Sequence, residues 1–85
     1  MENMRDNQEL WKNIAPIIKE KLGMTIIAYE TWIAPLYIVS CEGGIMNLHS
    51  PFSDTENQYV EKRYMPMIQY VVSEYMGESY EVLIE

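Results

Sequence analysis

The longest regular pattern of apolar positions in the chain lies between Ser53 and Met76. The apolar residues recur at helical intervals, which is typical of a helix with one buried face; they are Tyr59, Val60, Tyr64, Met67, Ile68, Val71, Val72 and Tyr75. Ser53 and Glu56 have the spacing of a capping box, and Gly77 supplies a left-handed stop. The pattern predicts one long helix, bent near Pro66 because proline removes a helical hydrogen bond.

A first helix is predicted near the N-terminus, where apolar residues recur at helical spacing from Leu10 to Leu22. Asp6 and Glu9 offer a capping box at its start, so residues 1–6 are expected to form a disordered tail. Pro16 interrupts the pattern. The helix is therefore expected either to kink at this proline or to start later than the capping box suggests.

A second, short helix is predicted between Gly23 and Pro35. Thr25 can cap its first turn, and the residue before Pro35 is forced out of the helical region. Many of its residues are β-branched and have low helix propensity. Packing must therefore hold this helix in place, with Tyr29 and Trp32 as the expected anchors.

Alternating apolar and polar residues predict two strands, at 36–42 and 45–50, joined by the two-residue turn Gly43-Gly44. A tight turn fixes the register, and in this register Val39 lies opposite Leu48. The predicted core face then carries Tyr37, Val39, Cys41, Met46 and Leu48, while Ile38 lies on the wetter face.

A third strand is predicted over Tyr80–Ile84. One helix crossing a sheet face returns the chain parallel to the strand it left, so this strand should run parallel to the second strand, beside either of the other two. The order α-α-β-β-α-β predicts a two-layer α+β domain over residues 7–85, in which helices pack on a small three-stranded sheet. The order is similar to that of RNA-binding KH folds, but the GXXG loop of those folds is absent.

Chain length, net charge and cysteine content limit the possible functions. The chain of 85 residues is long enough for one domain, and its net charge of −7 argues against a broad electrostatic grip on nucleic acid. No apolar run reaches the ~20 residues of a membrane span. The polar N-terminus lacks a signal-peptide core, and the single cysteine cannot form an internal disulfide. A cytoplasmic protein with little or no direct nucleic-acid or membrane binding is expected.

No set of residues has the spacing that catalysis or metal binding needs. His49 lies about 10 Å along the predicted hairpin from Cys41 and on the opposite face, whereas a nucleophile and its base need roughly 3 Å. The carboxylates are mostly single and fit a solvated surface. Pairs of cysteine or histidine at zinc spacing are absent, as is a glycine-rich phosphate loop. The expectation is a protein without enzymatic activity, metal or cofactor.

Three stretches, taken in order, resemble a known family. They are Leu10-Trp11, the run Tyr29-Glu30-Thr31-Trp32-Ile33-Ala34-Pro35-Leu36, and the run from Tyr59 to Ile68. Together they resemble the N-terminal domain of the DnaA family of bacterial replication initiators, over Leu10 to Ile84. The resemblance implies a protein-interaction domain and leaves open whether the chain is part of a full initiator.

The resemblance also implies which residues bind. The family recruits the replicative helicase, or binds regulators of initiation, through positions that correspond here to Ala28, Thr31, Trp32, Asp54 and Thr55. It self-associates weakly through the first helix around Leu10 and Trp11, although Trp11 is as readily interpreted as a core residue. The alternative function is a small stand-alone regulator of the same fold that mimics or titrates an initiator. Neither the partner nor the oligomeric state follows from the sequence.

Overall fold

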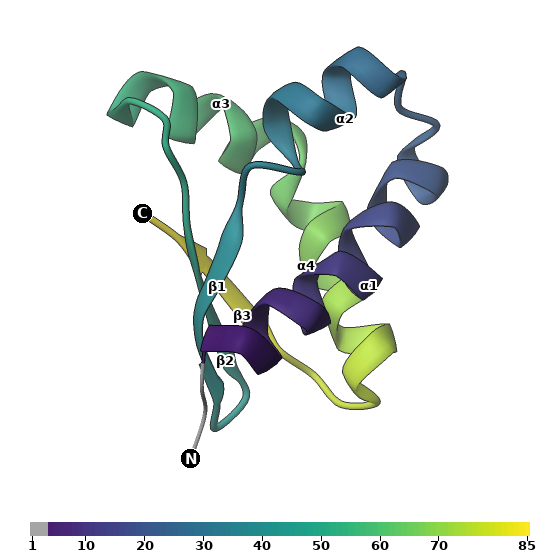
Figure 1. Ribbon diagram of the computed structural model, residues 1–85, viewed down its shortest axis with the longest axis vertical. Helices are drawn as coiled ribbons and strands as arrows, with labels where there is room; N and C mark the ends of the chain where they lie inside the picture. The colour runs from purple at the N-terminus through teal and green to yellow at the C-terminus, as the bar shows by residue number, and fades with distance from the viewer. Residues whose placement is uncertain (1–3) are drawn as a thin grey trace.

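The computed structural model describes residues 4–85, and four helices and three strands form an α+β architecture (Figure 1). The predicted tail lies outside the described residues at positions 1–3, and the first helix already includes positions 4–6. In chain order the elements are α1 (Met4–Leu22), α2 (Ile26–Trp32), β1 (Tyr37–Glu42), β2 (Ile45–His49), α3 (Asp54–Arg63), α4 (Met65–Met76) and β3 (Glu81–Ile84).

The sheet has the strand order β1-β2-β3, so β2 is central. β1 and β2 are antiparallel and joined at Gly43-Gly44, whose φ angles of 64° and 77° need glycine. β3 runs parallel to β2, with Glu81 opposite Ile45. The predicted turn and the parallel orientation of the third strand are therefore confirmed. The sequence did not indicate which strand lies beside β3, and in the structure it is β2.

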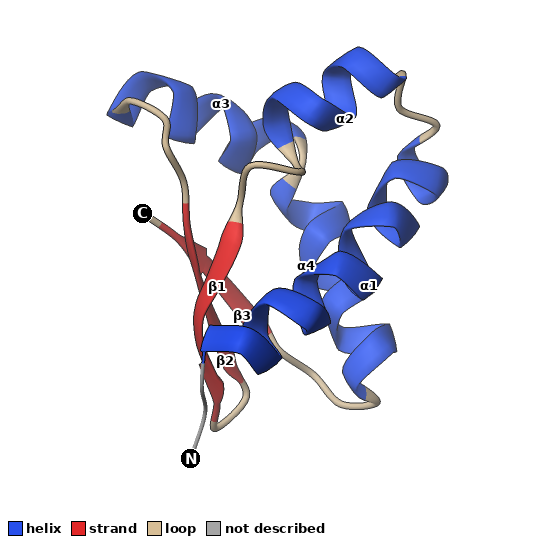
Figure 2. Cartoon of the chain, in the orientation of Figure 1, coloured by secondary structure: helices blue, strands red, loops and turns tan. Residues whose placement is uncertain are grey.

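Helices cover one face of this sheet (Figure 2). α1 and α4 lie together against that face, while α2 and α3 lie across the end of the sheet where β1 begins and β2 ends (Figure 1). Within residues 4–85 no helix covers the opposite face. The core lies between the helix pair and the sheet, and its largest fully buried side chains are Ile14, Ile18, Ile33, Leu36, Ile38, Met46, Leu48, Ile68, Val60 and Val72.

A β-bulge reverses the faces predicted for part of β1. Ile38 lies opposite Leu48, and the register shifts between Ile38 and Ser40, so Val39 has no partner in β2. Ile38 is 1% exposed, whereas Val39 is 47% exposed. The predicted core face was wrong for Tyr37, Val39 and Ile38, because strict alternation does not survive an inserted residue. It was right for Met46 and Leu48, which are fully buried, while Cys41 is half-buried.

The predicted long helix is divided in two. Its capping box at Ser53 and Glu56 and its left-handed stop at Gly77 are confirmed. α3 ends before Tyr64, which takes φ −116° and ψ −23°, and Pro66 then lies in the first turn of α4. A proline ring clashes with the carbonyl four residues earlier but is tolerated in a first turn. The chain therefore restarts the helix at the proline, which adds one helix to the predicted order.

Pro16, in contrast, lies inside an unbroken α1. The helix starts at Met4, so the prediction of a later start was wrong, and Asp6 lies in the first turn. Pro16 leaves the carbonyl of Lys12 without its helical donor. Both residues are exposed, so water can hydrate that carbonyl and the cost of the proline is reduced.

Candidate interaction surface on α2 and α3

An aromatic cluster attaches α2 to the first turns of α3. The ring centroid of Trp32 lies 5.3 Å from that of Phe52 and 4.8 Å from that of Tyr59, and Tyr59 lies 5.9 Å from Tyr64. Such edge-to-face and tilted pairs stabilise by about 0.5–1.5 kcal/mol beyond the area they bury. Because α2 contains no buried residue, these partly exposed rings carry much of its attachment. We call the surface formed by α2, the cluster and the start of α3 the α2–α3 surface.

The structure places the binding residues predicted on α2 within this surface. Thr31 is exposed, and its Oγ1 donates a hydrogen bond to the carbonyl of Ile27 at 2.7 Å. Ala28 is half-buried, and its N–H donates to the capping oxygen of Thr25 at 3.1 Å. Trp32, an expected anchor of α2, is partly buried and packs against the core. Its indole is therefore available both to the fold and to a partner.

The predicted residues on α3 lie in its first turn. Asp54 and Thr55 are exposed and follow the Ser53 cap. They come directly after Phe52, whose ring contacts Trp32. The structure thus links the two predicted halves of the site through Trp32 and Phe52 rather than through direct contacts that involve Asp54 or Thr55.

Sequence reasoning missed two apolar side chains on α2. Ile26 is 64% exposed and Ile27 is 78% exposed, the highest values among the large hydrophobic residues of the described chain. Tyr59 of the aromatic cluster is also exposed. A signal was present, because a seven-residue helix rich in apolar residues cannot turn all of them inward. Contiguous exposed apolar side chains on a soluble domain are typical of interaction sites.

A hollow borders this surface on the α1 side. It has a volume of about 360 Å³ and is lined by Leu22, Gly23, Met24, Thr25, Ala28, Arg63 and Tyr64. Burial, followed by the neighbouring Tyr59 hydroxyl, raises the pKa of Tyr64 above 10.0, and Arg63 opposes this shift. Burial, followed by the charge of Glu30, also raises the pKa of Tyr29 above 10.0. Both phenols are neutral at physiological pH and therefore offer uncharged hydroxyl groups beside the charged Glu30 and Arg63.

Trp11, the residue predicted for self-association, belongs to the core. Its side chain is 4% exposed, and its Nε1 donates to the carbonyl of Ile33 at 3.3 Å. Leu10 beside it is half-buried. The ring of Trp11 still lines a hollow of about 220 Å³ together with Gln8, Lys12, Ala34, Pro35, Leu36 and Tyr37. Contacts between copies around Trp11 would therefore involve the residues that border this hollow more than the indole itself.

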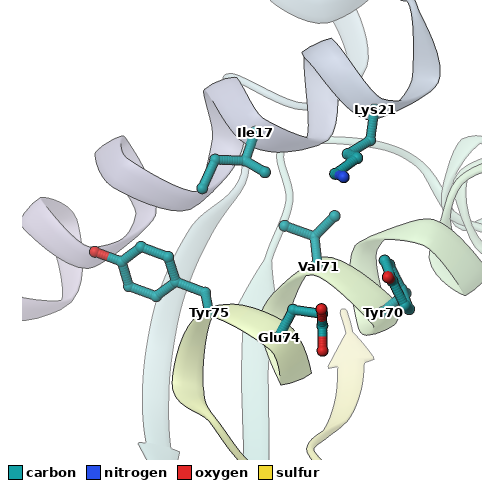
Figure 3. A pocket seen from close by; sticks show the side chains of 6 residues that line it. All are labelled: Ile17, Lys21, Tyr70, Val71, Glu74 and Tyr75. Carbon is teal, nitrogen blue, oxygen red and sulfur yellow. The ribbon is translucent and has the colours of Figure 1, made fainter.

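A further hollow lies between α1 and α4 (Figure 3). Ile17 and Val71 approach each other from the two helices, and Tyr70 and Tyr75 flank them in a volume of about 190 Å³. Lys21 and Glu74 complete its lining. Tyr75 is 44% exposed, so its predicted place on the buried helical stripe was wrong.

Within residues 4–85 no group of three or more His, Cys, Asp or Glu side chains could hold a metal ion. The ring of His49 lies 5.0 Å from that of Tyr37. This pair faces away from the core, opposite to Met46 and Leu48. Over residues 4–85 no helix has both the length and the apolar character that a membrane span requires.

Comparison with known proteins gives one distant relation. No protein-family model matches the chain. The chain is 19% identical over 78 residues to the chromosomal replication initiator protein DnaA of Lachnoclostridium phytofermentans. The match covers 88% of this chain but only 17% of that protein, so the chain spans a small part of its relative's length. Similarity to a DnaA protein thus extends over most of the described structure.

Proposed function

We propose that this chain is a protein-interaction domain of the kind found at the N-terminus of DnaA proteins, and that it binds a replicative helicase or a regulator of replication initiation. The carrying observation is α2, an apolar helix that buries none of its residues and exposes Ile26 and Ile27. The similarity to a DnaA protein supports a role in replication initiation. The proposed function is binding, without catalysis and without a metal or cofactor.

The α2–α3 surface contains the residue types that contribute most of the free energy in protein–protein binding. Burying a side chain such as Ile26 or Ile27 contributes about 1.5–3 kcal/mol relative to leaving it in water. Tryptophan and tyrosine dominate binding hot spots, and Trp32 and Tyr59 are both partly open to solvent here. A partner that covered α2 would also hold this helix against α3, because the partner would cover the solvent-exposed parts of the aromatic cluster.

Arginine at either of two α2 positions is expected to abolish binding. Thr31→Arg and Ala28→Arg each add a long charged side chain to the α2–α3 surface, next to the apolar side chains that a partner would cover. Because Thr31 is exposed and Ala28 half-buried, each variant should change the free energy of unfolding by under about 1 kcal/mol. Calorimetric titration with a purified replicative helicase, or with an initiation regulator, should show affinity reduced by at least about tenfold.

Ser79→Arg is the matched control for these variants. Ser79 is exposed and belongs to the connection between α4 and β3. This connection lies at the opposite end of the molecule from α2 (Figure 1). The control variant should bind as the unmodified chain does. Undiminished binding of the helicase or regulator to both α2 variants would show that this surface is not the binding site.

We also propose weak self-association through the N-terminal half of α1. Leu10 is half-buried beside Trp11, so Leu10→Gln should weaken contacts between copies without emptying the core. Sedimentation velocity over a range of concentrations should show a monomer–dimer mixture that this variant shifts towards monomer. Leu22→Gln makes the same change at a half-buried position at the other end of α1 and should leave the mixture unchanged. A chain that stays monomeric at every concentration would contradict the proposal.

A further inference from the structure

The outer edge of β3 is open for pairing. Glu81 and Glu85 donate their N–H groups to the carbonyls of Gly44 and Leu48, at 2.9 and 3.0 Å. In a parallel pair of strands, every second residue of one strand forms backbone hydrogen bonds with the neighbouring strand. The backbone groups of Val82 and Ile84 therefore point away from β2, towards the free edge. An edge strand with such groups is a template for another strand.

Only part of this edge is occupied. The N–H of Val82 donates to Gln69 Oε1 of α4 at 3.1 Å. Across the described residues no hydrogen bond from the outward N–H of Ile84 is present. The other edge of the sheet is different, because β1 carries the bulge at Val39, whose carbonyl accepts from Asn7 Nδ2 of α1 at 3.4 Å. The β1 edge of the sheet is thus interrupted by the bulge, whereas the β3 edge is accessible to another strand.

A trough runs along this open edge. One hollow of about 130 Å³ is lined by Glu61, Met65, Val82, Leu83 and Ile84. A second, of about 380 Å³, is lined by Asp54, Asn57, Gln58, Glu61, Ile84 and Glu85. Because they share Glu61 and Ile84 among their lining residues, the two hollows are neighbours between α3 and β3, and together they form the trough. The lining contains three carboxylates and neither lysine nor arginine.

We propose that this edge binds an extended, basic segment of a partner protein, which adds a fourth strand beside β3. Backbone pairing to Ile84 would give affinity, and alternate side chains of the added strand would lie over the trough. The carboxylates of Asp54, Glu61 and Glu85 select lysine or arginine in that row. The same charge disfavours a second copy of this chain, whose net charge is −7 and whose own β3 edge carries Glu81 and Glu85.

This inference does not depend on the function proposed above. The trough lies on the β3 side of α3, and among its lining residues only Asp54 is also one of the residues predicted to bind on the α2–α3 surface. Either site can be disabled while the other is measured.

The probe is a synthetic peptide of about ten residues that alternates lysine and valine. Added to the 15N-labelled chain, it should shift the amide resonances of Val82 and Ile84, and it should slow hydrogen exchange at Ile84 by about tenfold or more. Affinity should fall as salt rises, because exposed charges are screened. A peptide with glutamate in place of lysine should not bind. A lysine–valine peptide with a central proline should bind at least about tenfold more weakly, because proline cannot donate to the ladder.

Charge reversal provides the matching test on the protein. Glu61 and Glu85 are exposed, so the double variant Glu61→Lys, Glu85→Lys should fold normally and lose at least about tenfold in affinity for the lysine–valine peptide. Thr31→Arg should bind the peptide unchanged. Equal binding of the proline-containing peptide, or unaltered exchange at Ile84 when the peptide is bound, would overturn strand addition. Retention of affinity by the double variant would overturn the assigned trough.

Discussion

Replacing Ile38 by aspartate should unfold the domain, whereas the same substitution one residue later, at Val39, should leave it folded. Ile38 is 1% exposed and faces Leu48 inside the sheet, while Val39 is 47% exposed on the bulge. Aspartate at position 38 would remove a buried isoleucine side chain and place a carboxyl group in the apolar core. The free energy of unfolding should fall by about 5 kcal/mol or more. A chain of 85 residues has roughly 4–13 kcal/mol of stability in total.

Urea titration followed by circular dichroism measures both variants. Val39→Asp should change the free energy of unfolding by no more than about 0.5 kcal/mol, as for other surface substitutions. The pair is informative because strict alternation along β1 predicts the reverse result. If Val39→Asp unfolds and Ile38→Asp does not, the bulge is misplaced and the simple hairpin register is correct.

Trp11→Ala is expected to cost about 3–5 kcal/mol of stability, as a large core truncation. The indole is 4% exposed and its Nε1 donates to the carbonyl of Ile33, which joins α1 to the end of α2. Removing it leaves a cavity and takes away one of the two hydrogen bonds to that carbonyl, which keeps the bond from the N–H of Leu36 at 3.1 Å. The variant should therefore unfold at a much lower urea concentration, or fail to fold at all.

Trp11→Phe separates the contribution of ring packing to stability from that of the Nε1 hydrogen bond. Phenylalanine keeps an aromatic ring but removes the Nε1 donor, so this variant should fold and lose about 1–3 kcal/mol. Because it folds, it also allows sedimentation to test whether the indole influences self-association. A Trp11→Ala chain as stable as the unmodified protein would show that the indole is not a core residue.

Features set by local chemistry could be predicted from the sequence. Ser53 and Glu56 cap α3 because both partners lie within one turn, and Gly77 ends α4 because glycine tolerates a left-handed backbone. The Gly43-Gly44 turn fixed the register beside it, where Cys41 lies opposite Met46. The parallel orientation of β3 followed from the crossover rule that one helical connection across a sheet face returns the chain parallel to the strand it left, which does not depend on side-chain detail.

Features decided by tertiary packing could not be predicted. Val39 is as suitable for a strand interior as Ile38, and only the fit of β1 against α1 decides which of the two turns inward. Pro16 and Pro66 each lie in a stretch with a helical pattern, yet α1 continues through the first and the chain breaks before the second. Exposure to water does not distinguish the two sites, because Lys12 and Lys62, four residues before each proline, are both exposed.

The candidate site rests on two sources, the family resemblance and the exposure seen in the structure. Ala28, Thr31, Asp54 and Thr55 followed from the family resemblance, and the structure places all four at least partly open to solvent. Ile26 and Ile27 were missed because a short apolar helix was assumed to be held by burial. In the structure Tyr29 and Trp32 pack against the core, and Trp32 also contacts Phe52 and Tyr59. The sequence pattern did not distinguish the exposed isoleucines of α2 from such core contacts.

The parallel pairing of β3 with the central strand has a consequence for synthesis on the ribosome. β2 lacks its second neighbour until residues 81–84 have emerged, so in the nascent chain the central strand has only β1 beside it while α3 and α4 are being made. Contacts this distant in sequence form slowly because the intervening loop must close first. Co-translational folding of this domain is therefore expected to complete only after β3 has left the exit tunnel, and until then the backbone edge of β2 that β3 will occupy has no strand to pair with.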